Sequence, residues 1–314
     1  MNILGIDGGG TKTVCILMDE TGAVLGRGVG GPSNYQSVGI ETAQNAIETA
    51  VNAALTDSHI SPQTIDGIGL GLAGVGRSED IQTVQTFLEP LRQHLQVKPD
   101  HLMITGDHRI ALIGGLGHNV GVVAIAGTGS LLFGQNAQGQ TKRVGGWGYL
   151  LGDEGSGYNI ALRGLQAALK AYDGRLPTTD LIQRFQTHLG IEQIEGLIEV
   201  VYRRGWTVSQ IAALAPIIDQ AAVNGDRIAQ DIMNQAADEL VLATEVILVD
   251  LFNFTETVEI VTIGGVWQSL SNLRQRFESA IHSISPHISI IWPRHEPAYG
   301  AALWVLQGLN QPPD

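Results

Sequence analysis

The chain has 314 residues, enough for two domains of ordinary size, and a formal net charge of −13. Its acidic residues are spread along the sequence, which argues against nucleic acid or an anionic membrane as the main partner. Cys15 is the only cysteine, which excludes an intrachain disulfide, a thiol-rich zinc site and an iron–sulfur cluster held by one chain. With no signal-like N-terminus and no apolar run of about 18 residues, we expect a soluble, cytoplasmic protein.

The first third predicts a β-meander followed by βαβ units. Apolar runs bounded by glycine predict strands, and apolar residues at helical spacing predict helices. The strands are expected over residues 2–7, 13–19, 23–29, 65–73 and 102–105. The helices are expected over 41–55 and 80–95.

The pattern starts again near residue 120, with strands predicted over 122–126, 131–135 and 141–144. This repeat predicts two like-folded lobes, and the glycine-rich stretch 113–117 offers a hinge. We therefore expect domains 1–115 and 116–314.

The remainder is predicted to be mostly helical, with two further strands. The expected elements are helices over 160–172, 180–189, 208–224 and 226–252, a strand over 258–263, a helix beginning near 269, a strand over 288–292 and a last helix over 298–309. Packing of that last helix back on the first lobe stays open.

Two turns have the composition of phosphate-binding loops: DGGGTKT at 7–13 (glycine turn 1) and AGTGS at 126–130 (glycine turn 2). Glycines let backbone N–H groups approach phosphate oxygens, and an aspartate at a strand end can hold hydrated Mg²⁺. Each turn alone is equally typical of a β-hairpin. No Gly-x-x-x-x-Gly-Lys precedes Lys12, so this is not a Walker site.

Two more segments extend the match: GGWGYLLGDEGSG at 145–157 (the glycine-rich segment) and GGVWQS at 264–269. With all four in order, the whole chain resembles the N-acetylglucosamine kinases of the BadF/BadG/BcrA/BcrD ATPase family, in the actin, sugar kinase and Hsp70 superfamily. The resemblance implies an α/β fold of two actin-like (ribonuclease H-like) lobes with a nucleotide and sugar cleft between them. It implies an ATP- and Mg²⁺-dependent kinase acting on the 6-hydroxyl of an amino sugar, above all N-acetylglucosamine. It also implies a homodimer.

The same resemblance assigns roles to individual residues. ATP phosphates fall to Gly9, Gly10, Thr11, Lys12, Thr13, Gly127, Thr128 and Gly129, with Asp7 organising Mg²⁺. Adenosine falls to Gly264, Gly265 and Ser269, although a plain βα turn would also explain the two glycines. The sugar falls to Asn34, Asp107, Gly146, Trp147, Asp153 and Glu154.

A sugar hydroxyl needs a carboxylate to accept its proton as it attacks the γ-phosphate, and Asp107, after a predicted strand end, is our candidate base. A helix cap is its alternative role. Asp153 and Glu154 are the next candidates, and they could instead cap the following helix. Asn34 could simply form a turn, and Trp147 could simply pack in a core.

Three classes of function remain open: the kinase, an ATPase activator of a radical dehydratase, and a non-catalytic sugar sensor. The activators need two cysteines per chain for a cluster at a dimer interface, and this chain has one. A sensor would lack the base or the Mg²⁺ carboxylate. Within the kinase class, glucosamine and other N-acyl hexosamines, such as N-acetylmannosamine, remain as substrates.

Overall fold

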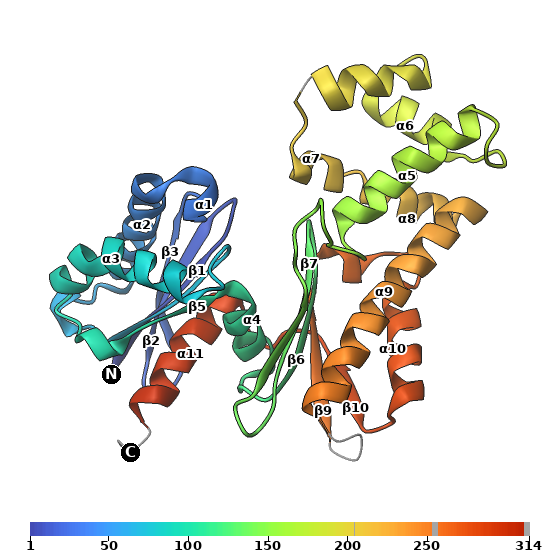
Figure 1. The fold of residues 1–314 in the computed structure, drawn as a ribbon. Helices are drawn as coiled ribbons and strands as arrows, with labels where there is room; N and C mark the ends of the chain where they lie inside the picture. Colours follow the sequence, from blue (N-terminus) through green and yellow to red (C-terminus); the bar gives the residue numbers. More distant parts are fainter. Residues whose placement is uncertain (204, 253–256, 311–314) are drawn as a thin grey trace. The chain divides into compact units, whose positions relative to one another are not determined.

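The computed structural model describes residues 1–203, 205–252 and 257–310, which form two compact units (Figure 1). Residues 1–121 and the segment from Trp292 onward belong to the first unit, and residues 122–291 form the second. The expected boundary near residue 115 falls inside helix α4 (Asp107–Leu116), which belongs to the first unit. The segment from Trp292 was expected in the second domain, 116–314. It belongs to the first unit instead, because its helix packs against the sheet of that unit.

The first unit is built on a five-stranded sheet in the order β3-β2-β1-β4-β5. Neighbours β1, β2 and β3 are antiparallel, whereas β4 lies parallel to β1 and β5 parallel to β4. The strands are β1 (Asn2–Gly8), β2 (Thr13–Asp19), β3 (Val24–Gly30), β4 (Gly67–Leu72) and β5 (Leu102–Gly106). The helices are α1 (Tyr35–Val38), α2 (Ile40–Ser58), α3 (Ser78–His94), α4 and α11 (Pro297–Leu309). All five predicted strands and the helices near 41–55 and 80–95 are confirmed.

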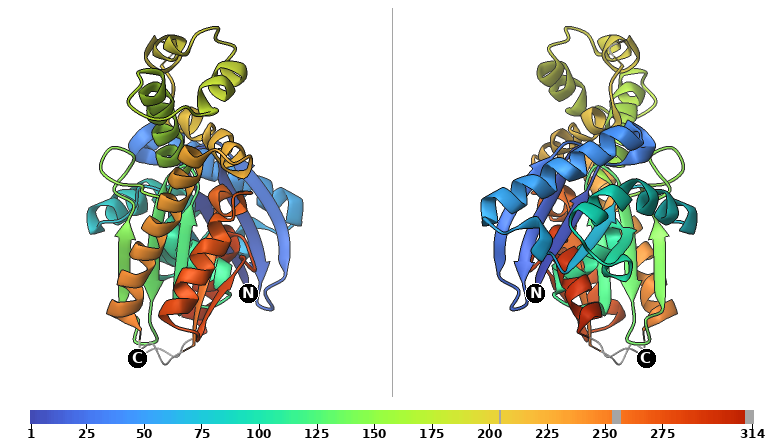
Figure 2. Two further views of the ribbon diagram at one scale, coloured as in Figure 1. Left: turned by 90° about the vertical axis from the view of Figure 1, so that its right-hand side faces the viewer. Right: turned by 90° about the vertical axis from the view of Figure 1, so that its left-hand side faces the viewer.

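Helices cover both faces of this sheet. Successive strand residues point to opposite faces, and β1 carries buried apolar side chains on both faces. On β1, Leu4 and Ile6 pack in a core shared with α2 and α3, whereas Ile3 packs in a core shared with α11 (Figures 1 and 2). Gly5 lies under α11, where an added Cβ would be 2.1 Å from the carbonyl oxygen of Ala298. The small residues of the last helix therefore allow a close helix-to-sheet contact.

The second unit repeats the sheet in the order β10-β9-β6-β7-β8. Taken from β8, this order corresponds strand for strand to that of the first unit, which confirms the predicted repeat. The strands are β6 (Gly121–Ala126), β7 (Ser130–Gln135), β8 (Thr141–Gly145), β9 (Val258–Ile263) and β10 (Ile288–Ile291).

Six helices of the second unit are described: α5 (Gly157–Tyr172), α6 (Leu181–Leu189), α7 (Val208–Ala212), α8 (Ala215–Val223), α9 (Arg227–Leu251) and α10 (Leu273–Ile284). The expected helix over 208–224 is broken into α7 and α8, and Pro216 lies in the first turn of α8, where its missing N–H costs no hydrogen bond. The helix expected near 269 begins at Leu273 instead. Residues 265–268 form a 3₁₀ turn that buries Trp267 against Phe277, with ring centroids 4.8 Å apart. Every helix in the described part of the chain is too short or too polar to be a membrane span.

Candidate functional site

Glycine turn 1 connects β1 to β2 and is closed by a hydrogen bond from the Gly9 N–H to the Lys12 carbonyl oxygen, 3.0 Å. Gly10, Thr11 and Lys12 are exposed. Thr13 is fully buried, and its hydroxyl lies 2.7 Å from both the Gly31 carbonyl oxygen and the Ser33 Oγ. The Thr13 hydroxyl is therefore used inside the fold, and its contact with a phosphate stays a prediction.

Asp7 lies at the end of β1 in an acidic part of the first unit. Burial raises the pKa of Asp7 to about 7, helped by the negative charges of Asp107 and Glu296 and opposed by Lys12. Glu296, which sequence reasoning missed, also pairs with Arg27, with Nη2 and Oε2 2.8 Å apart. A nearby cation would stabilise the ionised form of Asp7.

This carboxylate fits the way in which proteins hold Mg²⁺. Among the described residues, no group of three or more His, Cys, Asp or Glu side chains is arranged to hold a metal unaided. Mg²⁺ usually needs only one or two carboxylates, with water and substrate phosphates completing its coordination. Asp7 beside an exposed glycine turn meets that requirement.

Asp107 is the first residue of α4, and Gly106 is the N-cap, without a side-chain capping bond. The Asp107 Oδ1 accepts a hydrogen bond from the His108 N–H at 2.8 Å. Its side chain is 45% exposed, and the His108 ring nitrogen Nδ1 lies 3.6 Å from Oδ1. Asp107 is thus not the N-cap, and its carboxylate remains accessible. The contact with His108 was not foreseen.

Asn34 caps α1, since its Oδ1 accepts a hydrogen bond from the Gln36 N–H at 3.2 Å. Its backbone N–H donates to the Gly9 carbonyl oxygen at 3.2 Å, which ties it to glycine turn 1. No partner for its side-chain amide nitrogen occurs among the described residues. Asn34 therefore has a structural role and retains one donor group for a ligand.

Glycine turn 2 lies at the end of β6, against the strand end of β9. An added Cβ on Gly264, whose φ is +116°, would lie 2.2 Å from the Ala126 carbonyl oxygen and 2.9 Å from the Gly127 nitrogen. The start of α5 is bound to the same turn, because the Gly157 N–H donates to the Gly127 carbonyl oxygen at 2.8 Å. Glycine thus permits three chain segments to meet.

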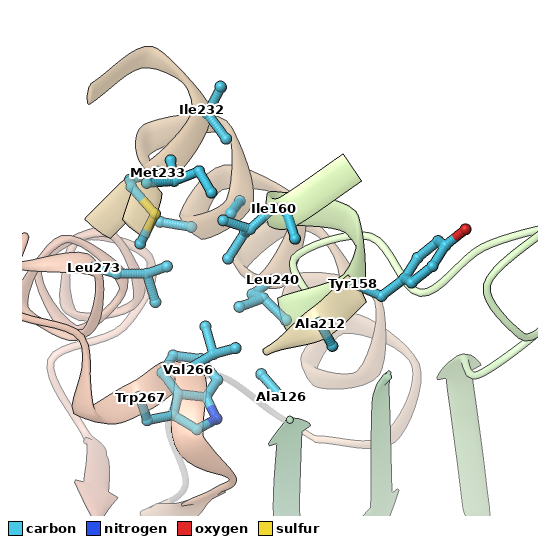
Figure 3. Packing of buried hydrophobic residues seen from close by; sticks show 14 of the residues in the cluster. Ala126, Tyr158, Ile160, Ala212, Ile232, Met233, Leu240, Val266, Trp267 and Leu273 are labelled. Carbon is cyan, nitrogen blue, oxygen red and sulfur yellow. The ribbon is translucent and has the colours of Figure 1, made fainter. Parts of the chain in front are cut away.

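A pocket of about 710 Å³ opens at this junction, within the second unit. Four of the predicted nucleotide residues line it: Gly127, Thr128, Gly265 and Ser269. The apolar side chains of Ile160, Met233 and Val266 line it as well (Figure 3). The predicted phosphate and adenosine motifs of this unit are therefore brought together around one cavity with an apolar wall, as a nucleoside requires.

The wall also contains Asp219, on α8, which sequence reasoning missed. Its carboxylate accepts hydrogen bonds from the backbone N–H groups of Leu270 at 2.8 Å and Ser271 at 2.9 Å. The Ser269 Oγ is buried and has no hydrogen-bond partner among the described residues. The one signal in the sequence was an acidic residue on the otherwise apolar face of a predicted helix, beside Ile218.

In the glycine-rich segment, Gly146 has φ +70° and Trp147 is 67% exposed. The Arg143 guanidinium lies over the Trp147 ring, 4.9 Å from its centroid. Trp147 is therefore not a core residue, and its ring is accessible to a ligand.

Asp153 faces glycine turn 2, with its carboxylate beside Gly129. Burial raises the pKa of Asp153. Hydrogen bonds from the backbone N–H groups of Gly148 and Ser130 act in the opposite direction and only partly offset this rise. The side chain of Glu154 is exposed. Neither caps α5, because the N-cap is Ser156, whose Oγ accepts from the Asn159 N–H at 3.1 Å. Asp153 instead ties the glycine-rich segment to the turn.

Comparison with known proteins identifies the family. The sequence profile of the BadF/BadG/BcrA/BcrD ATPase family matches residues 4–305. The N-acetylmuramic acid/N-acetylglucosamine kinase of Clostridium acetobutylicum is 32% identical over 301 residues, or 96% of this chain and 97% of that protein. The N-acetyl-D-glucosamine kinase of Dictyostelium discoideum is 34% identical over 315 residues, with the same two coverages, 96% and 97%.

A crystal structure from Chromobacterium violaceum, provisionally described as an N-acetylglucosamine kinase, is 27% identical. It matches with a TM-score of 0.78 and covers 98% of this chain and 99% of that one. The expected two-lobed α/β fold class is thereby confirmed. The chain belongs to the BadF/BadG/BcrA/BcrD ATPase family.

Proposed function

We propose that the protein is an ATP-dependent kinase that transfers the γ-phosphate to the 6-hydroxyl of N-acetylglucosamine. The observation that carries this proposal is the single pocket lined by both glycine turn 2 and the adenosine motif. Relatives with N-acetylglucosamine kinase names, similar over nearly the whole chain, support the choice of sugar.

Each unit has its own candidate ATP-binding residues. In the second unit, adenosine occupies the pocket beside Gly265 and Ser269, and the amides of residues 127–129 bind phosphate. In the first unit, Gly9, Gly10, Thr11 and Lys12 of glycine turn 1 bind phosphate. Asp7 would hold Mg²⁺, which would neutralise negative charge on the phosphates.

Asp107 is the general base. Its carboxylate accepts the proton of the sugar hydroxyl as the oxygen attacks the γ-phosphorus and the bond to ADP breaks. The exposed carboxylate at the start of α4 gives a hydroxyl access to it. In the first unit, the Asn34 amide nitrogen is the candidate sugar ligand. In the second unit, the Trp147 ring has that role, together with Gly146, Asp153 and Glu154.

N-Acetylmuramic acid is the second candidate substrate, and Arg143 is the observation that favours it. This sugar carries a carboxylate on a lactyl ether. The Arg143 guanidinium lies over the Trp147 ring, and its planar array of N–H groups is suited to bind a carboxylate. No carboxylate pairs with Arg143 among the described residues. A relative with both sugars in its name supports this alternative.

The test is ADP release by the purified protein with ATP and Mg²⁺. The sugars are N-acetylglucosamine, N-acetylmuramic acid, glucosamine, N-acetylmannosamine and glucose, with a sugar-free control. Strong stimulation by an N-acetylated sugar, with phosphate on the 6-oxygen by ³¹P NMR, is expected. Hydrolysis unchanged by every sugar would refute the kinase. We place the reaction in the cytoplasm, where ATP is available, and in a homodimer, which light scattering would test.

A further inference from the structure

Asp219 is a buried charge that the roles assigned above do not use. Its residue is 8% exposed, and no Lys or Arg side chain pairs with it in the described part of the chain. Burying an unpaired carboxylate is costly unless hydrogen bonds compensate it. Here the compensation comes from two consecutive backbone N–H groups, Leu270 on Oδ2 and Ser271 on Oδ1.

The loop that receives these bonds, residues 269–272, has little else to hold it. Buried side chains stand on either side of it, Trp267 before and Leu273 after, each 1% exposed. Within the loop, Leu270 is 66% exposed, and Asn272 adopts φ +62°. The apolar side chain of the loop thus points to solvent, so the Asp219 carboxylate is the tether for its middle.

The same loop carries Ser269 into the wall of the pocket. The Ser269 N–H is bound to the Val266 carbonyl oxygen at 3.1 Å, whereas its Oγ is buried with no partner among the described residues. Because Ser269 lines the pocket, rotation about its χ1 angle would turn this unpartnered hydroxyl toward a bound ligand, which would satisfy it. Its position depends on the two amides that follow it, which Asp219 holds.

We propose that Asp219 is a positioning residue for the nucleoside end of ATP, acting through Ser269. By fixing the amides of residues 270 and 271, it holds the Ser269 hydroxyl where a polar atom of the nucleoside can bond with it. This inference rests on the proposed nucleotide role of the pocket. It assigns Asp219 no part in sugar binding or in proton transfer.

A double-mutant cycle tests this coupling, with ADP affinity measured by calorimetry and steady-state kinetics measured alongside. Asp219→Asn turns one carboxylate oxygen into a donor facing an N–H group. We expect the Kd for ADP and the KM for ATP to rise about 10-fold, with the sugar KM changed less than about 2-fold. Ser269→Ala should weaken ADP binding, and the double variant should bind ADP about as weakly as Asp219→Asn alone. Asp238→Asn, an exposed carboxylate paired with Arg276 in the same unit, is the matched control.

Asp219→Glu retains both acceptor oxygens and should give an intermediate ADP affinity, which keeps the test informative if Asp219→Asn does not fold. Additive losses in the double variant would overturn the inference. So would an unchanged ADP affinity in a folded Asp219→Asn protein, or an equal rise in the sugar KM. Failure of the wild-type protein to bind ADP at all would instead refute the proposed function.

Discussion

Replacing Gly264 with alanine tests the junction between β9 and glycine turn 2. An added Cβ would lie 2.2 Å from the Ala126 carbonyl oxygen, whereas ordinary contacts begin near 3.4 Å, so backbone must move by roughly 1 Å. The φ of +116° adds strain of about 1–3 kcal/mol for a non-glycine residue. Overpacking adds about 1–3 kcal/mol. We therefore expect Gly264→Ala to lower the free energy of unfolding by at least about 2 kcal/mol and the Tm by several degrees.

The neighbouring residue provides the control. A Cβ on Gly265 meets no atom within 4 Å, and this residue lines the pocket. Gly265→Ala should leave the Tm within about a degree, and it should weaken ADP binding if a ring lies against that glycine. Differential scanning fluorimetry and calorimetry with ADP measure the two effects. A Tm for Gly264→Ala equal to that of the wild-type protein would refute the reasoning about this close approach.

Three further substitutions test other parts of the molecule. Asp107→Asn should lower kcat about 100-fold or more while ADP affinity is retained, with exposed Asp100→Asn as the control; normal turnover would place the base elsewhere. Gly5→Ala should lower the free energy of unfolding by about 1–3 kcal/mol, because the backbone of α11 blocks its Cβ. The control is Gly31→Ala, whose Cβ would have its nearest contact at 4.0 Å and should not lower stability. Equal Tm values in thermal unfolding would contradict the helix contact. Arg143→Met should lower kcat/KM for N-acetylmuramic acid about 10-fold relative to kcat/KM for N-acetylglucosamine. The control is Lys142→Met, which removes an ammonium paired with Asp250 and should not change this ratio. Parallel losses for both sugars would exclude the carboxylate contact.

The strands and the principal turns could be predicted from the sequence because their signals are local. Apolar runs ending in glycine specify both sheets, and the repeat of that pattern specifies that the two sheets are alike. The pairing of glycine turn 2 with Gly265 and Ser269 followed from a family resemblance, and the structure supplies the common pocket.

What the sequence could not supply depends on contacts between distant segments. The hydrogen bond of the Thr13 hydroxyl inside the fold could not be predicted, because its acceptor, the Ser33 Oγ, lies 20 residues later in the chain. The start of α10 depends on where Trp267 is buried, with its indole N–H donating to the Ala124 carbonyl oxygen at 3.0 Å. No sequence motif indicates the role of Asp219, because its hydrogen-bond partners are backbone N–H groups of a loop about 50 residues away.

The position of α11 has a consequence for the order in which the chain can fold during synthesis. One core of the first unit joins Ile3, Ile16 and Met18 to Ala302 and Val305 of this helix. A ribosome synthesises the first 121 residues well before it synthesises α11. The apolar face of the sheet that α11 covers is therefore exposed in the meantime. The second unit, continuous in sequence, has its whole core available earlier. The first unit therefore begins to emerge first but completes its core last. In an unfinished chain, the exposed apolar face of its sheet would be a binding site for chaperones.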